Sequence, residues 1–195
     1  LITGGKILHN EKENLEEKKG NKVSVACTSL VIATVLSFTV LGALALVPRV
    51  KYKLNKDGTY EINDVQNKYE LFRYDIPKIH NGKPVTKIAK SAFSNCENLK
   101  YVTIPDSMTS IGAGAFYNCV SLESIVVPNS VIECGQNAFL KTSIKEATVP
   151  AICTPGFPTL ETLEKITLTT GELIGNSNFY NCINLKEVNL PDTLL

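Results

Sequence analysis

Tryptophan is absent from this chain of 195 residues, methionine occurs once, and histidine occurs only at His9 and His80. A Ser/His/Asp or Cys/His catalytic site would have to use His80, whose surroundings are typical of an exposed loop. No phosphate-binding loop, zinc signature or dinucleotide fingerprint occurs. The 20 Lys and Arg residues against 19 Asp and Glu give no basic excess for nucleic acid. We therefore expect a protein that is not an enzyme, that holds no cofactor or metal, and that binds no nucleic acid.

Charge is also missing from the whole of residues 23–47, which are mostly apolar. As a helix rising about 1.5 Å per residue, this run would span about 37 Å, enough to cross a hydrocarbon core of about 30 Å. A buried core helix is the alternative, but nothing else in the chain could wrap it. The sequence therefore predicts a membrane segment over residues 23–48, preceded by a short disordered tail over the charge-rich residues 1–22.

Two fates of this apolar run stay open. Ala43–Ala45 has the small-x-small form of a signal-peptidase site, and Lys18, Lys19 and Lys22 make a basic region ahead of it. Cleavage near Ala45 would release the rest of the chain. However, the run is longer than the roughly 7 to 15 apolar residues of a signal peptide, which favours an uncleaved anchor. Basic residues on both sides of the run leave its orientation undecided by charge.

A phenylalanine, a cysteine and a leucine recur along the chain at a fixed spacing. The full copies are Phe93, Cys96 and Leu99; Phe116, Cys119 and Leu122; and Phe179, Cys182 and Leu185. The leucine position continues through degenerate copies at intervals of 23, 22, 19 and 22 residues, at Leu99, Leu122, Ile144, Leu163 and Leu185. Self-similarity at a period of roughly 20 to 50 residues predicts a solenoid of stacked turns.

Each leucine position leads into an alternating apolar pattern that often closes with proline, as in Val102, Ile104 and Pro105. This pattern predicts one short strand in every repeat of 19 to 23 residues. The same template begins at Leu71, which predicts an atypical first turn. A second buried position precedes each phenylalanine by five residues, at Ile88, Ile111, Cys134, Ile152 and Ile174. A single turn buries too little to fold alone, so only stacking makes the core continuous.

The segment Ile104–Cys119, with its Ile-Pro, Ile-Gly and Ala-Phe-x-x-Cys elements, resembles the repeat of the BspA-like leucine-rich-repeat family. The resemblance covers residues 82–195. Tyr52–Tyr60 looks like the hairpin ahead of that family's first repeat, so residues 49–81 are expected to hold a capping hairpin and the atypical first turn. The third repeat lacks its cysteine, and the fourth, ending at Phe157, is shortened, which should change the curvature locally.

The resemblance implies the fold class α/β, a strand-rich leucine-rich-repeat solenoid preceded by a single hydrophobic helix. Because the relatives are secreted or surface-exposed, it also implies that the N-terminus lies inside and the repeats outside the cell. The chain begins at Leu1 and ends at Leu195 directly after a strand, so we expect the repeats to be truncated at the C-terminus. Relatives are linked to adhesion, which implies binding of a protein or glycan ligand at the cell surface. The alternative is a spacer without a ligand that supports a missing C-terminal domain.

The six cysteines invite a disulfide framework, but the repeat argues against one. Cys96, Cys119 and Cys182 occupy the same position in their repeats and should point the same way into the core as small apolar groups. A bridge between Cys96 and Cys119 is the alternative. No CxxC pair or histidine cluster supports a metal site. Cys27 lacks the sequence context of a lipid-anchored cysteine.

The outward-facing strand positions are the remaining candidates for function. A column of alternating sign, formed by Lys100, Glu123, Lys145, Glu164 and Lys186, predicts favourable pairs between neighbouring strands. Two further columns form the candidate binding face, because solenoids present extended faces to partners. These residues are Arg73, Asp75, Tyr101, Thr103, Ser124, Val126, Glu146, Thr148, Lys165, Thr167, Glu187 and Asn189. Tyr101 is the best candidate for an anchor in this face.

Overall fold

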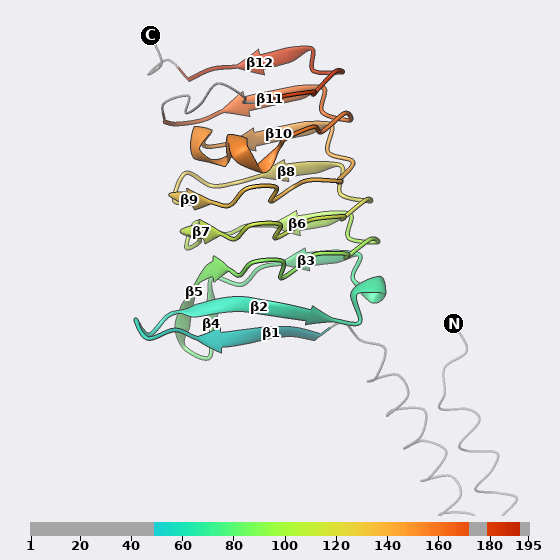
Figure 1. Ribbon diagram of the computed structural model, residues 1–195. Coiled ribbons are helices and arrows are strands. Elements are labelled where there is room, and N and C mark those ends of the chain that lie inside the picture. The colour runs from blue at the N-terminus through green and yellow to red at the C-terminus, as the bar shows by residue number, and fades with distance from the viewer. Residues whose placement is uncertain (1–48, 172–178, 192–195) are drawn as a thin grey trace, which may run out of the picture. The chain divides into compact units, whose positions relative to one another are not determined.

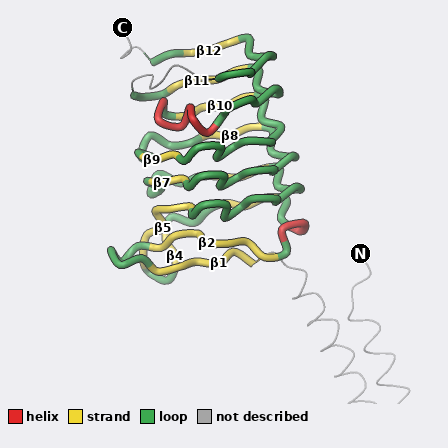
Figure 2. The backbone as a smooth tube through the Cα atoms, viewed as in Figure 1, coloured by secondary structure: helices red, strands yellow, loops and turns green. Residues whose placement is uncertain are grey.

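The computed structural model describes residues 49–171 and 179–191, which wind into a solenoid of short strands and tight turns (Figures 1 and 2). The twelve strands of this part are β1 (Arg49–Leu54), β2 (Tyr60–Gln66), β3 (Arg73–Asp75), β4 (Ile79–His80), β5 (Lys83–Ile88), β6 (Tyr101–Thr103), β7 (Ser110–Ile111), β8 (Ser124–Val126), β9 (Glu133–Cys134), β10 (Glu146–Val149), β11 (Lys165–Leu168) and β12 (Glu187–Asn189). Two 3₁₀ segments, η1 (Lys68–Glu70) and η2 (Ala151–Gly156), complete it. The class α/β is therefore too broad, since these residues form no α-helix.

The predicted membrane segment over residues 23–48 and the tail over residues 1–22 lie outside the described residues, as do Cys27 and Ile174. Within the described part of the chain, no helix is long and apolar enough to cross a membrane.

The strands of the described residues form parallel ladders on two opposite sides of the solenoid. On one side β2, β5, β7 and β9 pair in that order. On the other side β3 pairs with β6, and β8, β10, β11 and β12 form a separate four-stranded ladder. The strands that the alternating pattern predicted after each leucine position are those of this second side, where Figure 1 shows them stacked along the solenoid. β3, which lies in the first turn expected from Leu71, pairs with β6 in register.

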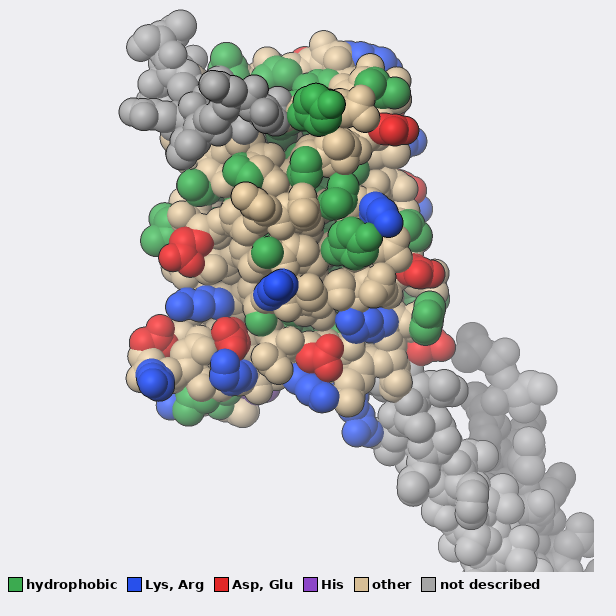
Figure 3. Space-filling model, viewed as in Figure 1, with side chains coloured by type: hydrophobic (Ala, Val, Ile, Leu, Met, Phe, Trp, Pro, Cys, Tyr) green, Lys and Arg blue, Asp and Glu red, His purple; other side chains and the backbone are tan. Residues whose placement is uncertain are grey.

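The hairpin of β1 and β2 covers the first turn of the solenoid. The two strands are antiparallel, with an irregularity between Lys51 and Tyr52, and β2 then pairs in parallel with β5. Tyr52 stacks on His80 with ring centroids 3.8 Å apart, and its hydroxyl group bonds that of Tyr74. Charges of both signs gather at this end of the molecule (Figure 3), and salt bridges such as that of Lys53 with Glu61 at 2.7 Å join several of them.

A column of stacked phenylalanine rings fills the interior. Phe93, Phe116, Phe139 and Phe157 are fully buried, and successive ring centroids lie 5.1, 5.6 and 4.7 Å apart. The leucine column packs beside them, with Leu99, Leu122, Ile144 and Leu163 equally buried. Fully burying each of these side chains contributes about 1.5 to 3 kcal/mol. The repeat pitch therefore corresponds to two continuous apolar columns, as the sequence predicted.

Asparagine shapes the turns that join the two ladders. Asn95, Asn118 and Asn181 directly precede the repeat cysteine and adopt φ values of 60°, 60° and 59°. Asparagine tolerates this left-handed conformation better than most residues. The Asn118 side chain also donates to that of Asn95 at 3.0 Å, which links one turn to the next.

The fourth repeat departs from the prediction. Ile152 was expected in the buried column before the phenylalanine, yet it is only partly buried, whereas Ala151 and Cys153 are fully buried. The physical reason is that this shortened segment forms η2 instead of a strand, so its side chains follow a helical period. Pro155, which cannot donate to a strand ladder, lies within it.

The described cysteines are free thiols in the core. Cys96, Cys119 and Cys153 are fully buried, Cys182 is 9% exposed and Cys134 is partly buried. Cys134 also takes the place of isoleucine in the second column, paired with Ile111 of the previous repeat. The prediction that the repeat cysteines pack as small apolar groups is therefore confirmed. Burial raises the pKa of the Cys182 thiol, which opposes reactivity of that group.

Candidate binding face

All twelve residues of the candidate binding face lie on β3, β6, β8, β10, β11 and β12, with side chains exposed or half-buried. They form two columns, because alternate residues of a strand point to the same side. Strand register places Arg73 beside Tyr101 and Asp75 beside Thr103. In the larger ladder the aligned sets are Ser124, Glu146, Lys165 and Glu187, and Val126, Thr148, Thr167 and Asn189. The structure thus brings the predicted residues onto one surface, interrupted only between β6 and β8.

At the N-terminal end of the binding face, the charged side chains satisfy one another. Arg73 donates to both carboxylate oxygens of Asp75, at 3.0 and 3.1 Å, and the Thr103 hydroxyl group donates to Asp75 at 2.6 Å. The hydrogen bonds from Arg73 and Thr103 hold the pKa of Asp75 below its usual range, and the pKa of Arg73 is raised in turn. This end of the face is an internal network with little free charge to offer a partner.

The C-terminal end repeats this arrangement. Lys165 pairs with Glu187 at 2.8 Å, and the Asn189 amide group donates to Glu187 at 2.8 Å. The bond from Lys165 is the main cause of the lowered pKa of Glu187, and the pKa of Lys165 is raised by the same contact. Both ends of the binding face therefore carry charges that are already neutralised within the protein.

The centre of the binding face is apolar by contrast. Tyr101 is 53% exposed and Val126 is 64% exposed, although neighbouring positions in their columns are charged or carry hydroxyl groups. The ammonium group of Lys100 lies 5.7 Å from the centre of the Tyr101 ring. Exposed aromatic and aliphatic side chains surrounded by polar ones are typical of recognition surfaces.

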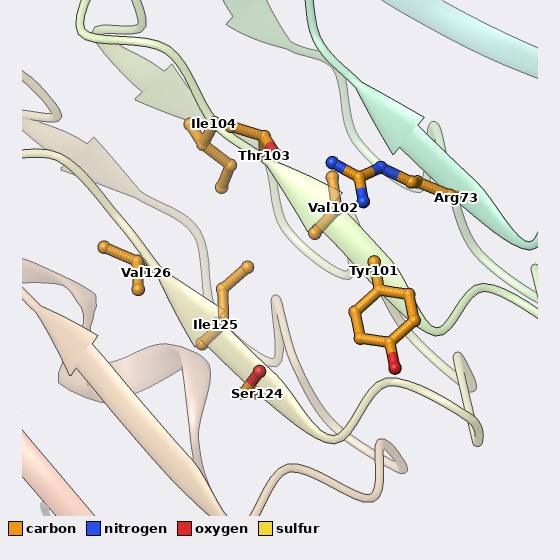
Figure 4. Close-up of a pocket in the computed structure, with 8 residues that line it drawn as sticks. All are labelled: Arg73, Tyr101, Val102, Thr103, Ile104, Ser124, Ile125 and Val126. Carbon is orange, nitrogen blue, oxygen red and sulfur yellow. The ribbon is translucent and has the colours of Figure 1, made fainter.

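A cleft of about 310 Å³ opens at this centre, between β6 and β8 (Figure 4). Its lining residues are Arg73, Tyr101, Val102, Thr103, Ile104, Ser124, Ile125 and Val126. The cleft reaches below the outer columns, since Val102 is partly exposed whereas Ile125 and Ala147, at the same strand position in later repeats, are buried. Five of the lining residues belong to the predicted face.

Sequence reasoning missed the cleft and assigned Val102, Ile104 and Ile125 to the core alone. These residues follow the same apolar alternation as every other repeat, so the pattern contains no signal of a gap. The only hint was Val126, the one aliphatic residue in a column of Asp, Thr and Asn side chains.

The column of alternating charge forms only in part. Lys100 lies 3.7 Å from Glu123, and Lys186 lies 2.7 Å from Glu164, which lowers the pKa of Glu164. Lys145, between these pairs, makes no salt bridge with any described residue. Such exposed pairs contribute about 0 to 1 kcal/mol each, so their main effect is to keep strands in register.

Within residues 49–171 and 179–191, no three His, Cys, Asp or Glu side chains converge into a set that could hold a metal ion. His80, the histidine that a catalytic site would have to use, lies on the hairpin side, stacked on Tyr52 and edge-on to Tyr60. It is not among the residues that line the cleft. The cleft is lined by apolar side chains together with the polar side chains of Arg73, Tyr101, Thr103 and Ser124.

Known proteins share this arrangement. The sequence matches the BspA type Leucine rich repeat region in six copies, over residues 67–155 and 151–195. The leucine-rich repeat protein TpLRR of T. pallidum is 24% identical, with a TM-score of 0.56 over 73% of this chain and 80% of that chain. A leucine-rich repeat protein from Bacteroides ovatus is 27% identical, with a TM-score of 0.51 over 74% of this chain and 46% of that one. No curated protein matches the sequence.

Proposed function

Because the chain belongs to the BspA-type leucine-rich-repeat family, we propose that it binds a protein partner through the outward face of β3, β6, β8, β10, β11 and β12. Solenoids of this kind generally serve protein-protein interaction and typically carry no enzymatic activity. Their stacked strands present an extended surface whose side chains vary from repeat to repeat. The variable positions here are the twelve residues of the binding face.

The main observation behind the proposal is that the centre of the binding face is apolar and exposed, whereas the charged side chains at its two ends are paired with each other. Tyr101 and Val126 flank the cleft, and both remain more than half exposed. Binding energy concentrates in central aromatic or aliphatic anchors that a polar rim shields from water. The paired charges at the two ends of the face supply such a rim, and they favour a defined orientation of the partner over a gain in affinity.

The proposal extends to a role at the cell surface, including adhesion. Its support is the charge-free run of residues 23–47, which is long enough for a membrane anchor that leaves the repeats outside. Secretion after cleavage near Ala45 is the alternative, and it would present the same binding face to the same partners. A glycan ligand is the rival to a protein partner.

The test uses the full chain, solubilised in mild detergent, and its binding to purified extracellular-matrix proteins and to a glycan array. We expect saturable binding to a matrix protein, weakened about tenfold or more by Val126→Lys, which places a charge at the apolar centre. Ile132→Lys is the matched control, because Ile132 is also exposed, at 70%, but lies beside β9 on the opposite side. It should change affinity by less than about twofold.

A spacer without a ligand, the remaining alternative, predicts that no matrix protein or glycan binds and that Val126→Lys has no effect. Equal losses from Val126→Lys and Ile132→Lys would also contradict the proposal, since the binding surface would then not be this face. Thermal unfolding of both variants should match that of the parent chain, because each substitution replaces an exposed side chain.

A further inference from the structure

The interruption of the binding face falls between the turn that carries Cys96 and the turn that carries Cys119. Among the described strands on this side, β3 pairs with β6 and β8 pairs with β10, but β6 and β8 do not pair. Cys96 lies five residues before β6, and Cys119 lies five residues before β8. The two cysteines therefore flank a junction between turns that strand pairing leaves open on this side.

The chain around these two cysteines is closely stacked. Three residues before them, the rings of Phe93 and Phe116 lie with centroids 5.1 Å apart. Directly before them, the Asn95 main-chain amide donates to the Tyr117 carbonyl at 2.8 Å, and the Asn118 side chain donates to that of Asn95 at 3.0 Å. Turns stacked at about the 4.8 Å of neighbouring strands bring equivalent Cα atoms within the roughly 4.4 to 6.8 Å that a disulfide bond spans.

The two thiols also contact each other. Cys96 and Cys119 are fully buried, and the Cys119 thiol reaches across the turn boundary to donate to the Phe93 carbonyl at 3.2 Å. The hydrogen bond from the Cys119 thiol lowers the pKa of Cys96, and the same contact, together with burial, raises the pKa of Cys119. Cys96 is therefore the better nucleophile of the two, because the thiolate is the reactive form.

Cys182 occupies the same repeat position without a thiol beside it. Its thiol also donates to a carbonyl of the preceding turn, that of Phe157, at 3.5 Å. The preceding repeat carries Leu160 at this position, and the repeat before that carries Thr142. Cysteines therefore follow one another at this position only in the first two full repeats, and Cys182 is a matched control for them.

We propose that Cys96 and Cys119 form a disulfide bond between consecutive turns when the chain folds in the presence of a small-molecule disulfide such as oxidised glutathione. The Cys96 thiolate attacks one sulfur atom of the external disulfide, and one thiolate leaves. Cys119 then loses its proton and attacks the Cys96 sulfur of this mixed disulfide, and the second thiolate leaves. Two electrons and two protons thereby pass to the external disulfide, which ends as two thiols. Because both residues are fully buried in the folded chain, the exchange takes place as the chain folds.

The bond would join residues 23 positions apart and link the turns of β6 and β8, which strand pairing does not join. Such a link stabilises a protein mainly by restricting the unfolded chain. It also limits the separation of β6 and β8, the two walls of the cleft. In the reduced form the two thiols pack as small apolar groups, so either form fits the core. The proposal goes beyond the proposed function and does not depend on it.

The test refolds the full chain from urea into mild detergent in a buffer of reduced and oxidised glutathione. Free thiols are then alkylated in denaturant, and the protein is cleaved after glutamate, which places each of the six cysteines in a different fragment. Mass spectrometry should find fragment 71–97 joined to fragment 98–123, two hydrogen atoms lighter than the reduced pair. Fragment 173–187, which contains Cys182, should carry the alkyl group.

Thermal unfolding gives a second readout. Oxidation should raise the Tm of the parent chain, and this rise should be smaller by about 5 to 12 °C in Cys119→Thr, which cannot form the bond. The third repeat carries Thr142 at this position, so threonine is compatible with the fold there. In the control variant Cys182→Thr, the rise should equal that of the parent.

Recovery of fragments 71–97 and 98–123 with alkylated cysteines from the folded protein would overturn the proposal. Links from Cys96 or Cys119 to Cys182 as frequent as the link between Cys96 and Cys119 would also defeat it, because pairing would then be random. An equal rise in Tm on oxidation in the parent and in Cys119→Thr would show that this pair adds no covalent link.

Discussion

Tyr74 is the one residue of the strand-centre column that brings a hydroxyl group toward the interior, where later repeats have Val102, Ile125, Ala147 and Ile166. Its ring lies 5.8 Å from that of Phe93, at the start of the phenylalanine column, and its hydroxyl group meets that of Tyr52 on the hairpin. Burial, followed by the hydrogen bond with Tyr52, raises the pKa of Tyr74 well above its ordinary value of 10.0. The surroundings of Tyr74, where the hairpin meets the first turn, therefore favour its protonated form.

This contact predicts a loss of stability in alkali. Tyr74 would ionise near pH 10.0 in the unfolded chain but only at higher pH in the folded one. Its contribution is thus complete below pH 10 and is lost as pH rises toward the folded-state pKa. In the parent chain, the free energy of unfolding should therefore fall between about pH 9 and about pH 11. In Tyr74→Phe this fall should be smaller by up to about 1 kcal/mol. The expected difference is below the full linkage value because Tyr74 is only half-buried and solvent screens the effect.

Urea unfolding of the parent chain and of Tyr74→Phe across this range measures the effect. Tyr69→Phe is the control for removing the hydroxyl group of an exposed tyrosine, since Tyr69 is 65% exposed. Identical pH dependence in the parent and Tyr74→Phe would show that the contact between Tyr52 and Tyr74 does not link the hairpin to the repeats.

At the scale of single residues, the sequence predicted the core columns well because a buried column must repeat its apolar residue at every turn. It failed at Ile152. This repeat is three to four residues shorter than the others, and together with Pro155 the shortening replaces a strand by η2, so that Cys153 points inward instead. It also could not distinguish which outward residues pair with one another. Arg73 and Asp75 were predicted as binding residues, yet they bond each other, which depends on side-chain conformations that a repeat pattern does not specify.

Among the elements, β5, β7 and β9 come unusually close where each strand ends. A Cβ atom added to Gly135 would lie 2.2 Å from the Ala113 nitrogen, and one added to Gly112 would lie 2.5 Å from the Lys90 nitrogen. Both contacts involve main-chain atoms of the preceding turn, which cannot move aside without opening the ladder. Glycine at these positions therefore sets the stacking distance on this side of the solenoid.

Gly135→Ala should accordingly lower the free energy of unfolding by at least about 2 kcal/mol, because the methyl group forces two turns apart. Gln136→Ala, at the neighbouring exposed position, should change it by less than about 0.5 kcal/mol. Thermal or urea unfolding of both variants gives the comparison. A Gly135→Ala variant as stable as Gln136→Ala would mean that the turns are less tightly packed than the described contacts require.

Strand positions were predictable element by element, since alternation over a few β-branched residues closed by proline recurs in each repeat. Pairing between elements was not fully predictable. The stretch from Val102 to Ile104 and that from Ile125 to Val127 obey the same alternation as the paired repeats, yet β6 and β8 remain apart. A ladder depends on main-chain contacts between turns, and these contacts leave no trace in the side-chain pattern of either strand.

For the solenoid as a whole, these features give its two sides different properties. The side of β5, β7 and β9 is closed by main-chain pairing and close glycine contacts. The opposite side carries the binding face, whose ends are neutralised by the pairs of Arg73 with Asp75 and Lys165 with Glu187. Between those ends the ladder opens into the cleft beside Tyr101 and Val126. Recognition is therefore expected at the centre of one side, with the other side serving stability.

Mapping a bound ligand onto the solenoid tests this central claim most directly. Amide chemical shifts of the full chain would be recorded by NMR during titration with the matrix protein or glycan that the binding test identifies. The account predicts that the largest changes fall on β6 and β8, with smaller ones on β3 and β10, and that β7 and β9 stay unchanged. Changes concentrated on β5, β7 and β9, with β6 and β8 unaffected, would contradict it.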